Sequence, residues 1–231
     1  MIAAWSFSRL KVFEQCPYRA KLQFVDKLSQ DHMDRTAANR GTMVHDAAEK
    51  FVRGEGDFIK EMEKFREYFH TCKEIYNSGR MILEEDWGFN SDWNVTGYWD
   101  DDIWLRMKLD QFFWDADDKH RAKAVDLKTG KLFGNEVSHN QQGQLYAIGA
   151  FMRYADLQVC DVNFVYLDQG KSKEKTYTRA KAMKFLPMWD KRAKSMTLAN
   201  KFPPKPNSIN CRFCPWGTSR GDGSCEWGVD S

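Results

Sequence analysis

One stretch of the chain, Leu105 to Gly130, constrains the fold and the function more than any other. It contains two segments rich in strand-forming residues, and each ends in an acid: Asp110 closes the first, and Asp126-Leu127-Lys128 closes the second. Residues two apart in a strand point to the same face, so we expect Asp126 and Lys128 to share a face, with Leu127 buried behind them. If the two segments pair as a hairpin, Asp110 comes to the same place.

Two carboxylates and an ammonium that face one pocket suit a divalent cation holding a phosphodiester. The acids would bind Mg²⁺ or Mn²⁺, the metal would activate a water molecule, and Lys128 would stabilise negative charge on the transition state. Taken alone, the same residues also fit a salt-bridged surface hairpin. Other parts of the chain have to decide between these two interpretations.

The composition is that of a globular protein. With 231 residues, 42% of them hydrophobic and 29% charged, the chain fits one large domain over 1–231. The formal net charge of +2 does not by itself identify a nucleic-acid-binding protein. We expect no membrane span, because no apolar run reaches about eighteen residues, and no signal peptide at the N-terminus. A cytoplasmic location follows as the expectation, with the six cysteines as thiols or metal ligands.

The hydrophobic patterns predict helices before and after a central group of strands, which is typical of an α/β or mixed α+β domain. Predicted strands cover Met81–Phe89, Ile103–Trp114, Ala122–Leu127, Asp161–Leu167 and Glu174–Thr178. Predicted helices cover a segment capped by Ser8 that ends near Cys16, then Pro17–Val25, Thr36–Arg53, Phe58–Tyr76, Asn135–Tyr154 and Lys181–Asn200, the last interrupted at Pro187. The tail from Phe202 has no periodicity of its own.

Two predicted helices carry polar side chains that could join the acids. His45 follows Gly41 by one turn, and as a neutral imidazole it could complete a metal shell, although a single histidine on a helix is more often solvated. Gln142 and Tyr146 lie four apart on one face of the later helix. They fit a contact to phosphate or to the lysine, and they equally fit a polar helix surface beside a buried tyrosine.

The cysteines suggest a second metal site. Cys211 and Cys214 have the two-residue spacing that lets both thiolates bind one metal, and Cys225 follows in a glycine-rich loop. The fourth ligand would be Cys16, because Cys72 lies on a core stripe and Cys160 lies next to a strand. Four thiolates fit either tetrahedral zinc or an iron–sulfur cluster, and either would join segments 1–30 and 201–231.

Taken in order, these motifs resemble RecB-type nucleases of the PD-(D/E)xK superfamily, in the branch that carries an iron–sulfur cluster. That branch includes CRISPR-adaptation exonucleases and their phage-encoded relatives. The matching elements are Cys16-Pro17, Gly41-x-x-x-His45, Asp110, Asp126-Leu127-Lys128, Gln142-x-x-x-Tyr146, Cys211-x-x-Cys214 and Cys225. The family often has glycine three residues before the first acid, where this chain has Met107.

The resemblance implies a restriction-endonuclease-like fold, a central mixed sheet flanked by helices. It implies that the Mg²⁺ or Mn²⁺ ion is held by His45, Asp110, Asp126 and the carbonyl of Leu127, with Lys128 acting on the water. Gln142 and Tyr146 would support the active site and the DNA. A structural [4Fe–4S] cluster would be held by four cysteines, Cys16, Cys211, Cys214 and Cys225.

The expected function is therefore a metal-dependent DNA exonuclease of a bacterium, an archaeon or a phage-infected host cell. Its substrate would be single-stranded DNA or DNA ends, cut with 5′-to-3′ polarity, with a recombination or CRISPR-adaptation protein as a candidate partner. Arg9, Arg19 and Lys21, together with Trp5 and Phe7, would guide the strand by charge and stacking. The alternative is a nucleic-acid-binding or scaffold module, catalytically inactive, with a structural zinc site.

Overall fold

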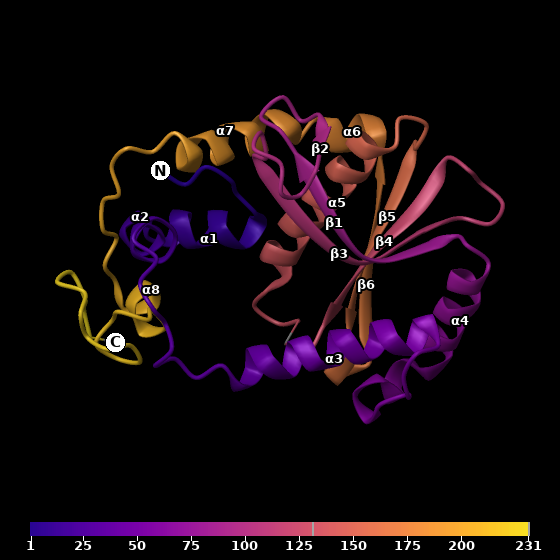
Figure 1. The fold of residues 1–231 in the computed structure, drawn as a ribbon, viewed down its shortest axis with the longest axis horizontal. Coiled ribbons are helices and arrows are strands. Elements are labelled where there is room, and N and C mark those ends of the chain that lie inside the picture. The colour runs from indigo at the N-terminus through magenta and orange to yellow at the C-terminus, as the bar shows by residue number, and fades with distance from the viewer. Residues whose placement is uncertain (131, 231) are drawn as a thin grey trace. The chain divides into compact units, whose positions relative to one another are not determined.

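The computed structural model describes residues 1–130 and 132–230, which divide into two compact units (Figure 1). The terminal unit consists of Met1–Arg35 and Pro187–Ser231, and the sheet unit consists of Thr36–Leu186. The two segments expected to carry the cysteine site, 1–30 and 201–231, both belong to the terminal unit. The acids, the lysine and the histidine all belong to the sheet unit.

The sheet unit is built on a six-stranded mixed sheet in the order β2-β1-β3-β4-β5-β6. Neighbouring strands are antiparallel except for β4 and β5, which are parallel and are joined by helix α5. The strands are β1 (Met81–Phe89), β2 (Val95–Thr96), β3 (Leu105–Trp114), β4 (Arg121–Lys128), β5 (Val159–Tyr166) and β6 (Lys171–Thr178). The helices are α3 (Thr36–Arg53), α4 (Arg66–Asn77), α5 (Glu136–Arg153) and α6 (Arg179–Met183), with 3₁₀ turns at Lys60–Phe65 and Leu167–Gln169.

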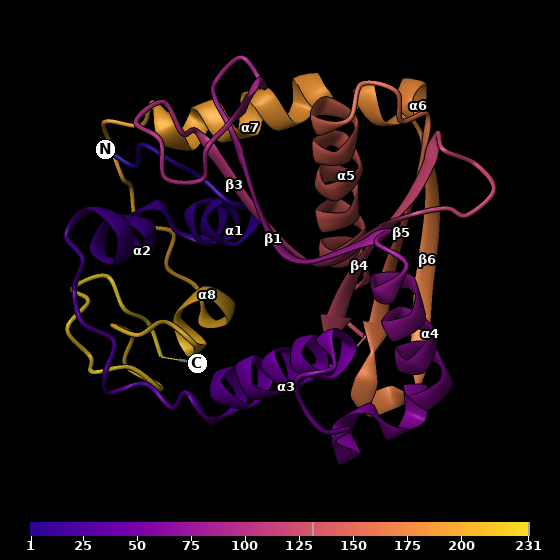
Figure 2. The same cartoon turned by 45° about the vertical axis from the view of Figure 1, so that its right-hand side comes forward.

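Helices cover both faces of this sheet (Figure 2). Apolar residues of α3 and α4 form one core with odd-numbered residues of the strands, including Leu83, Val125 and Val165. Helix α5 packs on the other face, where a Cβ atom on Gly143 would lie 3.3 Å from the ring of Phe164. Because successive residues of β5 point to opposite faces, this strand is buried on both sides.

The regular alternation breaks in the middle of β1 and β3. Leu83 packs in the core with α3 and α4, yet Trp87 packs on the other side, against Tyr154 at the end of α5. Likewise, Gln111 accepts a hydrogen bond from Tyr68 of α4, whereas the Met107 side chain occupies the space beside Gly149 of α5. Both strands therefore switch faces between these positions.

The switch occurs where Glu84 lies opposite Asp110. The ladder pairs Leu83 with Gln111 and Glu85 with Leu109, and it skips the pair between them. Glu84 has a φ of 51°, a left-handed backbone that a glutamate in a strand rarely adopts. Consequently, Leu83 and Gln111, on one side of this break, face α3 and α4, whereas Trp87 and Met107, on the other side, face α5.

The terminal unit packs its N-terminal helices against the helix that opens its C-terminal segment. Its helices are α1 (Phe7–Gln15), α2 (Pro17–Ala20), a π-helical turn (Lys21–Val25), α7 (Leu186–Thr197) and α8 (Ser208–Arg212). The rings of Trp5 and Trp189 are stacked with centroids 6.4 Å apart, and Arg192 donates two hydrogen bonds of 2.7 Å to Glu14. These contacts hold together two segments that are far apart in the sequence.

Most predicted elements are confirmed, and three predictions are wrong in detail. Ser6, rather than Ser8, caps α1, because its side chain accepts from the Arg9 amide. The stripe predicted as one helix over Phe58–Tyr76 is a 3₁₀ turn followed by α4. The tail, predicted without an element, contains α8, whose first turn is capped by Asn207. None of the helices in the described residues is long and apolar enough to span a membrane.

Candidate functional site

The predicted hairpin forms, and it brings the acid–x–lysine triplet into the expected arrangement. Strands β3 and β4 pair antiparallel, with Gln111 opposite Val125. Lys128 Nζ lies 2.5 Å from Asp126 Oδ2, so the two side chains share a face. Leu127, between them, is only 3% exposed and packs in the opposite core.

Helix α5 fixes the orientation of the Asp126 carboxylate. Its Oδ1 atom accepts a hydrogen bond of 2.6 Å from the Tyr146 hydroxyl and one of 3.1 Å from the Gln142 amide. The same amide donates to Tyr146 at 2.7 Å, while the Gln142 carbonyl oxygen accepts from Lys128 at 3.2 Å. Asp126, Lys128, Gln142 and Tyr146 therefore belong to one polar network.

Asp110 connects this network to α3. Its Oδ2 atom accepts a hydrogen bond of 2.6 Å from the Leu127 amide, in the middle of the triplet. Its Oδ1 atom lies 3.1 Å from Nδ1 of His45, on α3. The carboxylate is largely buried, with 12% of the side chain exposed, and the histidine is 27% exposed.

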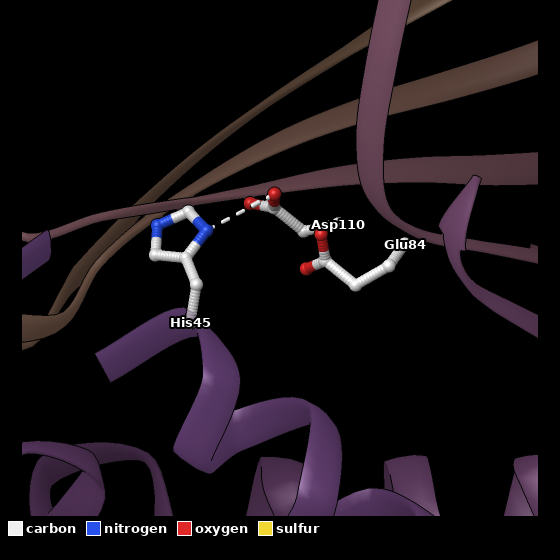
Figure 3. A group of neighbouring side chains, drawn as sticks. All are labelled: His45, Glu84 and Asp110. Atoms are coloured by element: carbon white, nitrogen blue, oxygen red, sulfur yellow. Dashed lines mark hydrogen bonds and ion pairs between the residues drawn. The ribbon is translucent and has the colours of Figure 1, made fainter. Parts of the chain in front are cut away.

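Glu84 joins this group, and the sequence analysis missed it. Ligand atoms of His45, Glu84 and Asp110 all lie within 4.8 Å of one another, and Figure 3 shows the three side chains converging. Among the described residues, this is the one group of three or more histidines, cysteines and acids with that spacing. The only signal in the sequence was the run Glu84-Glu85-Asp86, three charged residues that interrupt an otherwise apolar strand.

The charges in this group change the proton affinities of its members. Burial lowers the pKa of His45, but the hydrogen bond and the charge of Asp110, with the charges of Asp126 and Glu84, raise it to about 9. Burial and the Asp110 charge raise the pKa of Glu84 to about 7. Burial and the Asp126 charge raise the pKa of Asp110, against the opposing effects of His45 and the Leu127 amide. Negative charge is thus in excess here, and protons partly neutralise it.

The four predicted cluster cysteines line one pocket of the terminal unit: Cys16, Cys211, Cys214 and Cys225. Among residues 1–130 and 132–230, no three of their sulfur atoms lie within 4.8 Å of one another. Burial raises the pKa of Cys214 and of Cys225, and the neighbouring thiols add to both effects. Cys72 and Cys160 are buried elsewhere, in the core of the sheet unit.

The predicted DNA-guiding residues are engaged within the terminal unit. The Arg9 guanidinium donates to the Ala4 carbonyl and lies 5.2 Å from the ring centre of Phe24. Lys21 forms an ion pair of 2.6 Å with Asp26, and Arg19 lines the cysteine pocket. Trp5 is fully buried, so its ring cannot stack on a base.

Comparison with known proteins gives one partial match to a family model. Residues 4–87 match the family model of the PD-(D/E)XK nuclease superfamily. The matched segment is less than half of the chain; it contains His45 and Glu84 and ends before Asp110. No curated protein matches the chain.

Two solved structures match more than nine tenths of the chain. The crystal structure of SSO0001 has a TM-score of 0.51 and 13% sequence identity, and the match covers 98% of this chain and 88% of that one. A crystal structure described as a candidate exonuclease from Eubacterium rectale has a TM-score of 0.48 and 14% identity, with 92% and 86% covered. At 13% identity, the likeness to the first of these structures concerns the fold alone. The mixed sheet flanked by helices is the predicted restriction-endonuclease-like arrangement.

The raised pKa of His45 makes the stability of the metal-free protein depend on pH. Its folded-state pKa of about 9 exceeds the ordinary value of 6.5. The stabilisation from its pairing with Asp110 is therefore complete below about pH 6.5 and is lost as the pH rises through about 9. We expect the free energy of unfolding to fall by about 1–3 kcal/mol more in the wild type than in His45→Gln over this range.

Urea denaturation in EDTA at a series of pH values measures this difference. A wild-type protein whose pH dependence matches that of His45→Gln would contradict the assigned ion pair.

Proposed function

We propose that this protein is a divalent-metal-dependent DNA nuclease of the PD-(D/E)XK type that hydrolyses phosphodiesters. The observation that carries the proposal is the convergence of Asp110, Asp126 and Lys128 at the end of a hairpin, with His45 against the first acid. A surface ion pair would not require the hydrogen bonds that Gln142 and Tyr146 direct at Asp126. The superfamily match over residues 4–87 supports the same reaction class.

The carboxylates of Glu84 and Asp110 and the imidazole of His45 fit a hard divalent cation that also accepts a nitrogen ligand. Carboxylates suit Mg²⁺ and Mn²⁺, and an imidazole favours Mn²⁺ over Mg²⁺. We assign His45, Glu84 and Asp110 as side-chain ligands, because their ligand atoms lie within 4.8 Å of one another. The resemblance adds Asp126 and the Leu127 carbonyl, whereas Glu84 was not among the predicted ligands. A bound cation would supply the polarisation of a phosphate oxygen and of a water molecule.

The protein's own groups would then orient the reactants and stabilise charge. Lys128 presents an ammonium held between Asp126 and Gln142, where it can donate a hydrogen bond to a phosphate oxygen that gains negative charge. Burial and the Asp126 charge keep the pKa of Tyr146 well above its usual value, so its hydroxyl stays a donor and fixes that carboxylate. This preorganisation removes the need to rearrange the site during the reaction.

The finer assignment follows the resemblance of the motifs: an exonuclease that acts on single-stranded DNA or DNA ends, with 5′-to-3′ polarity. The same resemblance places a recombination or CRISPR-adaptation protein among its candidate partners.

We also propose that Cys16, Cys211, Cys214 and Cys225 hold a [4Fe–4S] cluster with a structural role. Zinc–sulfur bonds of about 2.3 Å would put the sulfurs of a tetrahedral zinc site about 3.8 Å apart. Among the described residues no three of these sulfurs lie within 4.8 Å of one another, so they are not spaced as in a tetrahedral zinc site. The assignment of the iron–sulfur cluster follows the resemblance of the motifs. Arg19, which lines the same pocket, would offset the negative charge of such a cluster.

Loss of Lys128 should abolish cleavage without preventing DNA binding. Lys128→Ala removes the donor for the transition state, so we expect cleavage of end-labelled single-stranded DNA in Mn²⁺ or Mg²⁺ to slow by at least about 100-fold. The control Lys184→Ala changes an exposed lysine on another element and should cleave like the wild type. Cleavage by Lys128→Ala at the wild-type rate would refute the assignment. Intact binding with no cleavage by the wild type in either metal would favour a binding module.

Glu84 should contribute to metal affinity, whereas its neighbour should not. We expect Glu84→Gln to weaken Mn²⁺ binding by about tenfold in isothermal titration calorimetry, because a charged ligand becomes neutral. Glu85→Gln makes the same chemical change one residue later, at a side chain that lies 3.7 Å from Arg153 instead. Equal affinities for the two variants would remove Glu84 from the ligand set.

An iron–sulfur cluster in the protein would absorb visible light. Protein purified without oxygen should be brown, with broad absorbance near about 400 nm. Cys225→Ser should lose this absorbance and the bound iron, and Cys160→Ser, which alters a cysteine in the sheet core, should keep both. Colourless wild-type protein that contains stoichiometric zinc would establish the zinc alternative.

A further inference from the structure

A pocket of about 310 Å³ lies between helix α5 and strands β5 and β6, outside the residues assigned to the reaction. Its lining includes four rings and two lysines: His139, Phe164, Tyr166, Tyr177, Lys173 and Lys175. The volume is near the lower end of the range of about 300–1,000 Å³ for small-molecule sites. It suits an occupant the size of one nucleotide rather than a longer segment.

The strand pairing makes this pocket continuous with the catalytic face. Asp126 on β4 pairs with Phe164 on β5, which pairs with Lys173 on β6, so the three side chains lie side by side on one face. Lys128 pairs with Tyr166 in the same way, and its Nζ atom lies 5.6 Å from the ring centre of Phe164. A group bound in the pocket would therefore adjoin the lysine that contacts the scissile phosphate.

One ring of the lining, His139, is partly exposed and can stack on a base, whereas the rings of Phe164, Tyr166 and Tyr177 are at most 6% exposed and lie behind it. The His139 ring is stacked on Phe164 with centroids 5.4 Å apart, and its Nδ1 atom lies 2.6 Å from the Tyr166 hydroxyl. These contacts hold the His139 ring in a fixed position, which reduces the entropy lost when a base stacks against it. Base–aromatic stacking of this kind tolerates any sequence, because every base has a flat face.

The charges at the rim favour an anionic occupant. Lys175 donates to Asn140 at 2.8 Å, and within the described residues Lys173 has no ion-pair partner. Of the two acids of the rim, Glu174 is paired with Lys123 at 2.7 Å, and Glu136 accepts from the Gly134 amide at 2.8 Å but keeps its charge, so the two lysines leave the rim with one positive charge in excess. The lysines thus remain available for a phosphate group.

We infer that this pocket binds one nucleotide of the substrate strand, next to the scissile phosphate, with its base against the His139 ring and its phosphate near Lys173 and Lys175. The inference rests on the proposed nuclease function for the identity of the strand. It adds a subsite that would hold the strand in register with Lys128.

The first test measures binding of fluorescein-labelled hexathymidylate by anisotropy in EDTA, where no cleavage is needed. We expect the double variant Lys173→Glu/Lys175→Glu to bind about tenfold more weakly or worse, because two phosphate contacts become repulsive. Lys184→Glu, which adds a negative charge at an exposed site outside the pocket, should stay within about twofold of the wild type. Binding by the double variant as tight as that of Lys184→Glu would overturn the inference.

The second test locates the base. In a series of hexathymidylates with one abasic position each, one position should weaken wild-type binding by about tenfold. The same position should have little effect in His139→Leu, because the stacking is already lost. A series with no sensitive position, or thymidine monophosphate binding as tightly as the hexamer, would overturn the assignment to the substrate strand. Failure of the nuclease would instead appear as intact binding without cleavage, so the two outcomes can be told apart.

Discussion

The Asp110 carboxylate holds the candidate site of the sheet unit together. One of its oxygens accepts the Leu127 amide of β4, and the other lies against His45 of α3, so a single side chain links three elements. It reaches them from the point where β1 and β3 switch faces and where Glu84 adopts a left-handed backbone. Such a conformation costs about 1–3 kcal/mol in general. In a regular strand pair, the backbone of Asp110 would be paired with that of Glu84 in the ladder. The Glu84 side chain would then point in a different direction from the one it takes here.

Charge balance explains why a divalent cation suits this arrangement. Glu84, Asp110 and Asp126 bring three carboxylates together, while His45 and Lys128 bring two groups that can be cationic. In the metal-free protein the raised pKa values of His45 and Glu84 retain protons that offset part of the negative charge. If His45 becomes neutral to bind a metal, three carboxylates and one ammonium leave two negative charges. A divalent cation neutralises them, so metal and protons compete for the same site.

The sequence predicts most of the fold because its periodicities are clear, and it predicts the hairpin site because alternation places Asp126 and Lys128 together. It could not reveal Glu84, since the face switch depends on the register between β1 and β3. Nor could it explain Met107, which stands where the resembling family often has glycine. That side chain occupies space beside Gly149, more than forty residues away, where a Cβ atom on the helix would collide with it. A methionine at position 107 is accommodated because residue 149 is a glycine. A local sequence motif does not contain such a long-range packing relation.

The sheet topology explains why the Asp126-Leu127-Lys128 triplet and the pocket beside α5 are neighbours. Parallel strands need a crossover, and α5 makes the one between β4 and β5, so the helix must return over the sheet beside the end of β4. Gln142 and Tyr146 are thereby placed against Asp126, and His139 and Gly143 against Phe164 on the neighbouring strand. Ligands in open α/β sheets bind beyond the carboxyl ends of parallel strands, where Lys128 and Tyr166 end β4 and β5. One crossover helix thus orients the Asp126 carboxylate on one strand and forms a wall of the pocket on the next.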